Sequence, residues 1–82
     1  MERDVTQILS AATDSVSLIN GVDAGTWSVE GMEQSDINDM VQRNVDHLEI
    51  ILAYEEVVAD ASDKTSYTSA VTTGKAYITA NS

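Results

Sequence analysis

Cysteine and proline are absent from this chain, and glycine is rare. Without cysteine there is no disulfide, no thiolate nucleophile and no zinc site built on sulfur. Without proline, glycine is the only strong breaker of helices left. Three of the four glycines, Gly21, Gly25 and Gly31, lie in one short window, while Gly74 stands apart. That window predicts the main loop of the protein.

Positive charge is also scarce. Four Lys and Arg residues stand against 14 Asp and Glu, which gives a formal net charge of −10. Phosphate binding draws on clustered cations, and the four cations here do not form a run, so direct binding of nucleic acid is not expected. Copies of the chain repel one another unless an interface overcomes that repulsion, and the acidic balance suits a basic protein surface.

No long apolar run occurs either. A membrane span needs roughly 18 consecutive apolar residues, and the N-terminus lacks the basic and apolar regions of a signal peptide, so no membrane contact or standard export is expected. The 82 residues, 43% hydrophobic, predict a single small domain, 1–82, rather than a disordered chain. A domain of this size has a thin core, and without disulfides, binding to other subunits is the stabiliser that remains.

Apolar residues recur at spacings of three and four along three segments, which predicts three helices, at about 3–19, 36–61 and 64–79. Asn20 and Gly21 are expected to stop the first, Ser35 or Asp36 to cap the second, and Ser62 or Asp63 to cap the third. The second segment carries two neighbouring stripes, namely Ile37, Val41, Val45, Leu48, Leu52 and Ala59, and Met40, Ile51, Tyr54 and Val58. Two stripes indicate a helix that touches two neighbours.

The expected fold is therefore all-α, a small three-helix bundle with up-down-up connections and a loop containing glycine and Trp27 after the first helix. An alternative is that the first helix swaps onto a neighbouring copy. Residues 26–29 alternate briefly in polarity, which is compatible with a short strand, but we favour a loop that folds back so that Trp27 covers the bundle. Gly74 is expected to let another element approach the third helix closely.

His47, the single histidine, is the first candidate for chemistry. Asp46 precedes it directly and Glu49 lies two residues after it, but neither projects with it from a helix. A zinc site needs three or four converging ligands, so we interpret His47 as a residue on the flank of a helix that packs or forms a hydrogen bond at a contact.

Acidic pairs are the second candidate. The pairs Glu55 with Glu56 and Asp60 with Asp63 are expected on a solvated face, because acid and base catalysis needs a cleft and the alternating oxygens of a calcium loop are absent. The sequence thus predicts no enzyme, no cofactor and no metal.

The runs "NVDHLEIILA" at 44–53 and "TTGKAYITAN" at 72–81 resemble small uncharacterised helical proteins of tailed bacteriophages. The resemblance covers the second half of the chain. It implies a viral context, with the protein in the virion or otherwise in the host cytoplasm, and it identifies no functional residue.

The leading hypothesis is a structural or assembly protein of a phage virion, such as a capsid decoration or head-tail connector component that binds other virion proteins or further copies of itself. The alternative is an acidic inhibitor or regulator of a host protein, which could mimic nucleic acid. Aromatic residues are the expected protein contacts, namely Trp27, Tyr54, Tyr67 and Tyr77.

Overall fold

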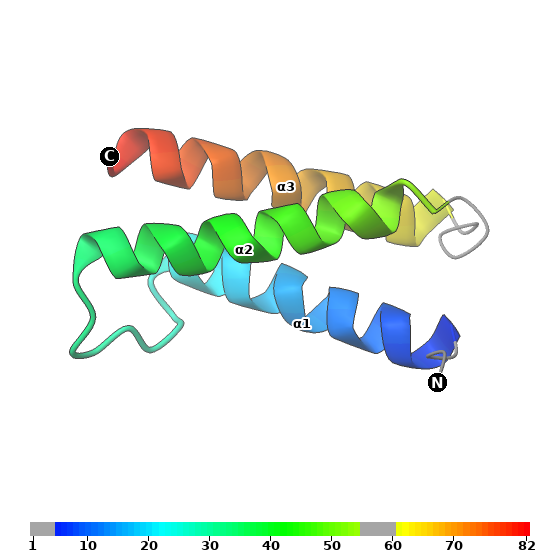
Figure 1. The fold of residues 1–82 in the computed structure, drawn as a ribbon, viewed down its shortest axis with the longest axis horizontal. Helices are drawn as coiled ribbons and strands as arrows, with labels where there is room; N and C mark the ends of the chain where they lie inside the picture. Colours follow the sequence, from blue (N-terminus) through cyan, green and yellow to red (C-terminus); the bar gives the residue numbers. More distant parts are fainter. Residues whose placement is uncertain (1–4, 55–60) are drawn as a thin grey trace.

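The chain folds into three helices, α1 (Val5–Ala24), α2 (Gln34–Leu52) and α3 (Ala61–Ala80), in a computed structural model that describes residues 5–54 and 61–82. Consecutive helices run in opposite directions, so α1 and α3 both point toward the end of the molecule where the C-terminus lies (Figure 1). The predicted all-α three-helix bundle is confirmed.

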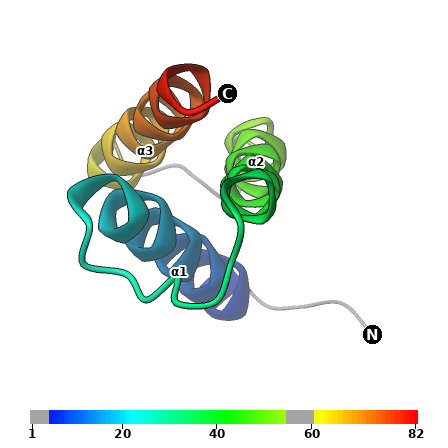
Figure 2. The ribbon, with the colours of Figure 1, turned by 90° about the vertical axis from the view of Figure 1, so that its left-hand side faces the viewer.

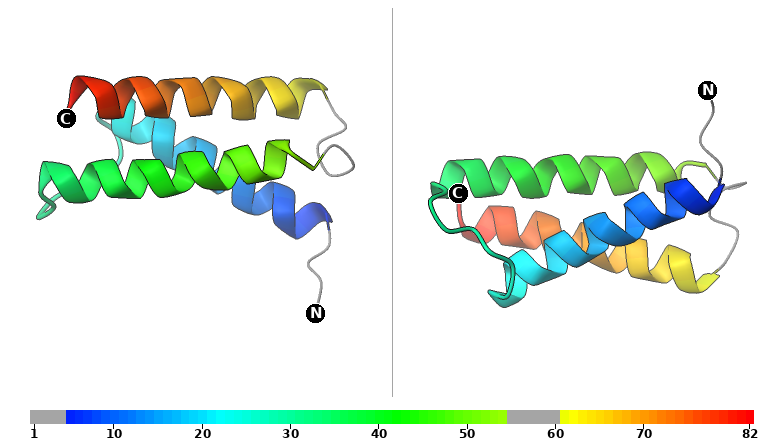
Figure 3. Two further views of the ribbon diagram at one scale, coloured as in Figure 1. Left: turned by 45° about the horizontal axis from the view of Figure 1, so that its top comes forward. Right: turned by 90° about the horizontal axis from the view of Figure 1, so that it is seen from below.

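Each helix contacts both of the others. Seen from the end, the three helices occupy the corners of a triangle (Figure 2). α2 and α3 lie nearly antiparallel. α1 crosses the pair obliquely, from the C-terminal end of α2 toward the C-terminal end of α3 (Figure 3). This arrangement buries one side of every helix and leaves the opposite sides in solvent.

The core is formed by apolar residues from one side of each helix. Its buried apolar side chains are Ala12, Ile19, Val22, Ile37, Val41, Val45, Leu48, Ile51, Tyr67, Ala70 and Val71. A second layer of half-buried side chains, which includes Val29 and Met32 of the loop, packs against them. The loop therefore folds back onto the bundle, as expected, and no strand occurs in residues 25–33.

Gly74 lies buried where the three helices meet. A Cβ atom at this position would lie 2.5 Å from Val45 Cγ2 and 3.3 Å from both Ile19 Cγ2 and Val41 Cγ1. Because ordinary van der Waals contact needs more space than this, only glycine allows α3 to approach α1 and α2 so closely. The expected role of Gly74 is confirmed.

The predicted end of α1 is wrong. The helix continues past Asn20 and Gly21 because Val22 adds a further buried side chain to the core. It ends at Gly25, whose φ of 78° is readily adopted only without a side chain. The Thr26 amide donates to the Gly21 carbonyl (2.8 Å) and the Gly25 amide to the Val22 carbonyl (3.2 Å), the two hydrogen bonds of a Schellman motif.

The predicted limits of α2 are also wrong. Glu33, rather than Ser35 or Asp36, is the N-cap, and it makes no capping hydrogen bond through its side chain. The helix ends at Leu52, with Ala53 as its C-cap, instead of near residue 61. With 19 residues, α2 is close in length to α1 and α3, which have 20 residues each. The predicted continuation through Val58 and Ala59 lies outside the described residues.

α3 begins at Ala61 rather than at residue 64. Ser62 and Asp63, the two predicted caps, therefore lie inside the first turn of the helix. Glu55, Glu56 and Asp60, which were expected on a solvated face, lie outside the described residues.

Candidate functional site

Three polar residues meet between α1 and α2. Ser15 of α1 is only 3% exposed, and its Oγ lies 2.8 Å from Asn44 Oδ1 and 2.9 Å from His47 Nδ1, both on α2. The Asn44 amide nitrogen in turn donates to the carbonyl of Met40, at 2.8 Å. We call Ser15, Asn44 and His47 the polar cluster.

The directions of these hydrogen bonds follow from the number of hydrogens available. Because Asn44 donates through Nδ2 to Met40, its Oδ1 is the atom that faces Ser15 and acts as an acceptor. Ser15 has a single hydroxyl hydrogen, which it donates to Asn44. His47 Nδ1 must therefore carry a hydrogen and donate it to Ser15 Oγ. In the neutral imidazole, Nε2 then carries no hydrogen.

This direction is the reverse of what a serine nucleophile requires. In nucleophilic catalysis the imidazole accepts the hydroxyl hydrogen, and the hydroxyl faces a substrate. Here the Ser15 hydrogen is already committed to Asn44, and the hydroxyl is buried between two helices. The polar cluster thus acts as a contact between α1 and α2, which is the role that the sequence indicated for His47.

A metal site and a membrane span are two further possibilities for residues 5–54 and 61–82. In that part of the chain, no group of three or more His, Cys, Asp or Glu side chains lies close enough to hold a metal ion. Within the same residues, no helix is both long and apolar enough to cross a membrane.

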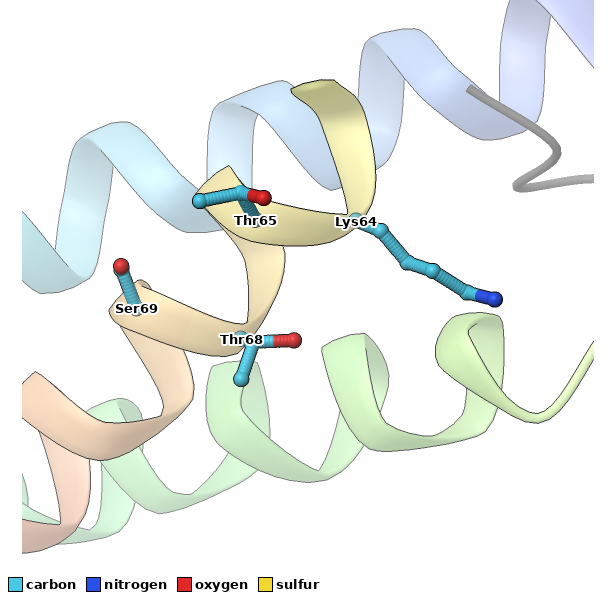
Figure 4. Close-up of a pocket in the computed structure, with 4 residues that line it drawn as sticks. All are labelled: Lys64, Thr65, Thr68 and Ser69. Carbon is cyan, nitrogen blue, oxygen red and sulfur yellow. The ribbon is translucent and has the colours of Figure 1, made fainter. Parts of the chain in front are cut away.

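A shallow hollow lies on the first turns of α3. It has a volume of about 400 Å³, is wide open to solvent and is lined by Lys64, Thr65, Thr68 and Ser69 (Figure 4). All four side chains are exposed and come from one helix. A groove of this kind offers no enclosed volume in which a small molecule would lose most of its hydration.

The four aromatic residues predicted as protein contacts separate into three groups. Tyr54 is 54% exposed and Trp27 is 40% exposed, so both remain available to a partner. Tyr67 is 3% exposed and belongs to the core, which corrects its assignment as a contact residue, because a side chain buried inside the bundle cannot reach a partner. Tyr77 is half-buried, and its hydroxyl accepts a hydrogen bond from Gln34, at 2.9 Å.

Trp27 is not the lid that the sequence predicted. A Cβ placed on Gly21 would lie only 3.1 Å from the Cβ of Trp27. Trp27 therefore lies against the last turns of α1, while part of its ring remains in solvent. Val29 and Met32 cover the core in its place.

Ile50 is the residue that the sequence analysis missed. It is 58% exposed, the largest exposed fraction among the big apolar side chains of the described residues. It lies one helical turn before Tyr54, because Ala53 keeps an α-helical conformation and the Tyr54 amide donates to the Ile51 carbonyl at 3.0 Å. A signal was present: Ile50 falls in neither apolar stripe of α2, so it had to lie on the outer side.

Acidic charge is distributed unevenly over the molecule. Residues 5–54 hold eight acidic side chains and one basic side chain, Arg43, whereas residues 64–82 hold two lysines and no acid. The one ion pair among the described residues joins these parts, with Lys75 Nζ at 3.4 Å from Glu49 Oε2 on an exposed surface. On α2, Asp39 and Asp46 lie eleven and four residues before Ile50, which places both on its side of the helix, with Arg43 between them.

Comparison with known proteins adds no relative: no family model matches the chain, and neither a curated protein nor a solved structure matches it.

Proposed function

We propose that this protein is a non-enzymatic binding protein that assembles with other protein subunits. The observation that carries the proposal is the pair Ile50 and Tyr54, two large side chains that are more than half exposed, one in the last turn of α2 and the other about one turn further along the chain. Scattered exposed apolar residues are normal on protein surfaces, but adjacent ones that include an aromatic ring are typical of protein contacts.

The polar groups of the interior support the same proposal. Among the described residues, every buried side-chain nitrogen and oxygen has a hydrogen-bond partner within the protein. The most suggestive polar constellation, the polar cluster, uses its hydrogens to join α1 to α2. The surface that remains for function is the outer side of the helices.

In its finer form, the proposal is a structural component of a phage virion, such as a capsid decoration or head-tail connector protein. The support is the resemblance of residues 44–53 and 72–81 to small phage proteins, together with a short bundle that offers little beyond its outer surface. In this form the partners are other virion proteins.

The second candidate is an acidic inhibitor or regulator of a host protein. It is favoured by the charge distribution, since residues 5–54 have a net charge of −7 from eight acids and one arginine. A mimic of nucleic acid would carry an unbroken row of carboxylates, whereas Arg43 stands between Asp39 and Asp46 along α2.

The experiment that separates these candidates measures where the protein is found. We expect the chain in purified virions, at a copy number per particle that matches a capsid or tail symmetry, as counted by quantitative mass spectrometry. Absence from the particles would overturn the virion proposal. Association with a host protein that is abolished by salt would then favour the inhibitor, because exposed charges are screened within about 10 Å at 0.1 M salt.

A further inference from the structure

The outer side of α2 near its C-terminal end differs from the rest of the helix surface. Ile50 lies on α2 and Tyr54 is the second residue after its end. Because Ala53 keeps an α-helical conformation and the Tyr54 amide donates to the Ile51 carbonyl, Tyr54 follows Ile50 by about one helical turn. We call these two residues the α2 patch. It lies at the end of α2 away from the loop that contains Trp27 (Figure 1).

The residues before the α2 patch supply a polar rim. Asp46 lies one turn before Ile50, and its carboxylate accepts a hydrogen bond from Gln42, at 2.8 Å. Arg43 lies seven residues before Ile50, and Asp39 lies four residues before Arg43. All four rim side chains are exposed, so an apolar centre is bordered by polar groups of mainly negative charge.

This anatomy fits the centre of a protein interface. Interfaces combine a few large, well-packed apolar anchors with a polar rim that excludes water. The surface area of two side chains is smaller than the roughly 800 Å² that each partner buries in a stable interface, so the rim must take part in the contact. The partner therefore has to satisfy the apolar centre and the acidic rim together.

Charge decides between the two kinds of occupant. A second copy of this chain would bring another net charge of −10 and another Asp46 toward the same rim. Like charges placed opposite one another disfavour such a pairing, whereas a surface with basic residues is attracted during the approach. A basic partner is thus the better complement of the two.

From these observations we propose that the α2 patch and its rim form the docking surface for a protein partner that presents an apolar ridge flanked by Lys or Arg residues. The inference rests on the proposed binding function and deepens it, because it assigns the surface and the chemistry of the partner. The apolar centre provides most of the affinity, and the charged rim provides the selection.

The test uses the full-length protein and a defined probe. The probe is a synthetic amphipathic helix of about 18 residues, roughly the length of α2, with leucine along one side and lysine on both flanks. Binding is followed by NMR titration of the ¹⁵N-labelled protein. We expect shifts concentrated in residues 43–54, and an affinity that falls severalfold between about 0.05 M and about 0.5 M salt.

Substitutions then examine each part of the surface. Ile50→Ser and Tyr54→Ser should each weaken the probe about tenfold or more, as is typical of anchor residues, with unchanged melting temperature because both side chains are exposed. Trp27→Ser is the matched control, since it removes the other exposed large apolar side chain and should leave the affinity unchanged. Asp46→Lys should weaken the lysine-flanked probe severalfold without touching the apolar centre.

Several results would overturn the inference. Shifts centred on α3 or on Trp27 would place docking elsewhere, and equal binding of a probe with glutamate flanks would remove the role of charge. A stable dimer that Ile50→Ser abolishes would make a second copy the occupant. The proposed virion function fails separately, if the chain is absent from particles, whatever the probe shows.

Discussion

Two parts of the interior lie within one turn of each other on α2 and are built in opposite ways. At Gly74 the helices touch through bare apolar contact, against Val41 and Val45, with no room for a further carbon atom. At the polar cluster, α1 and α2 are joined by hydrogen bonds through Ser15. The apolar contact at Gly74 is tight but fixes no direction, whereas each hydrogen bond of the polar cluster needs a donor hydrogen aimed at an acceptor atom.

The difference shows how a thin core can still specify one arrangement. Apolar packing supplies most of the stability, but it tolerates sliding of one helix along another. A hydrogen bond to a buried serine is satisfied at one register only, because a shift by one residue leaves a polar atom without a partner. We therefore expect substitutions at Gly74 to change mainly stability, and substitutions in the polar cluster to change mainly the fit between α1 and α2.

The largest effect is expected at Gly74. Gly74→Val should lower the free energy of unfolding by about 2–3 kcal/mol, because the new side chain would overlap Val45 and Ile19. Urea unfolding followed by circular dichroism measures the change. Gly74→Ala should be milder, since the overlap is smaller and alanine recovers about 1 kcal/mol of helix propensity.

A double-mutant cycle identifies the overlap as the cause. Val45→Ala removes the methyl groups nearest to the added Cβ, so it should cost less in the Gly74→Ala background than in the natural protein. We expect a coupling of about 1 kcal/mol or more, as for residues in direct contact. If Gly74→Ala instead stabilises the protein, the close approach of α3 is not needed for the fold.

The next effect is expected in the polar cluster. Ser15→Ala should lower the free energy of unfolding by about 1–2 kcal/mol, because Asn44 Oδ1 and the imidazole of His47 lose their partner between the helices. The measurement is again urea unfolding.

Ser17 provides the control for that substitution. It lies two residues further along α1 and is exposed, so Ser17→Ala should slightly increase stability, by about 0.5 kcal/mol or less, through better helix propensity. Equal effects at Ser15 and Ser17 would mean that the hydrogen bonds contribute nothing beyond those to water.

The sequence predicted the helices but not their ends, and the reason is physical. Spacing of apolar residues reports which side of a helix is buried, so the stripe that contains Val41, Val45 and Leu48 correctly indicated the core side of α2. No local residue signals the end of α2 at Leu52, because neither glycine nor proline follows it closely. The end of α1 depended on Val22, whose burial outweighed a plausible stop at Gly21.

The candidate site was harder to predict for a related reason. Ser15 is a polar residue on an apolar face, three after Ala12 and four before Ile19, and its partners come from another helix. Sequence spacing within one helix could indicate that His47 and Asn44 share a flank, but not which residue of α1 faces them. Likewise, Tyr54 and Tyr67 both lie on apolar stripes, and only the packing of whole helices exposes one and buries the other.

The smallest expected effect, and the most specific, concerns the position of a single hydrogen on the His47 ring. Since Ser15 donates its hydrogen to Asn44, the neutral imidazole should carry its hydrogen on Nδ1 rather than on Nε2. NMR spectra that correlate the ring nitrogens with the carbon-bound ring hydrogens distinguish the two forms. In Ser15→Ala this preference should disappear, whereas in Ser17→Ala it should persist. A hydrogen found on Nε2 in the natural protein would mean that Ser15 donates to His47 instead, the direction a serine nucleophile uses, and would reopen the polar cluster as a catalytic candidate.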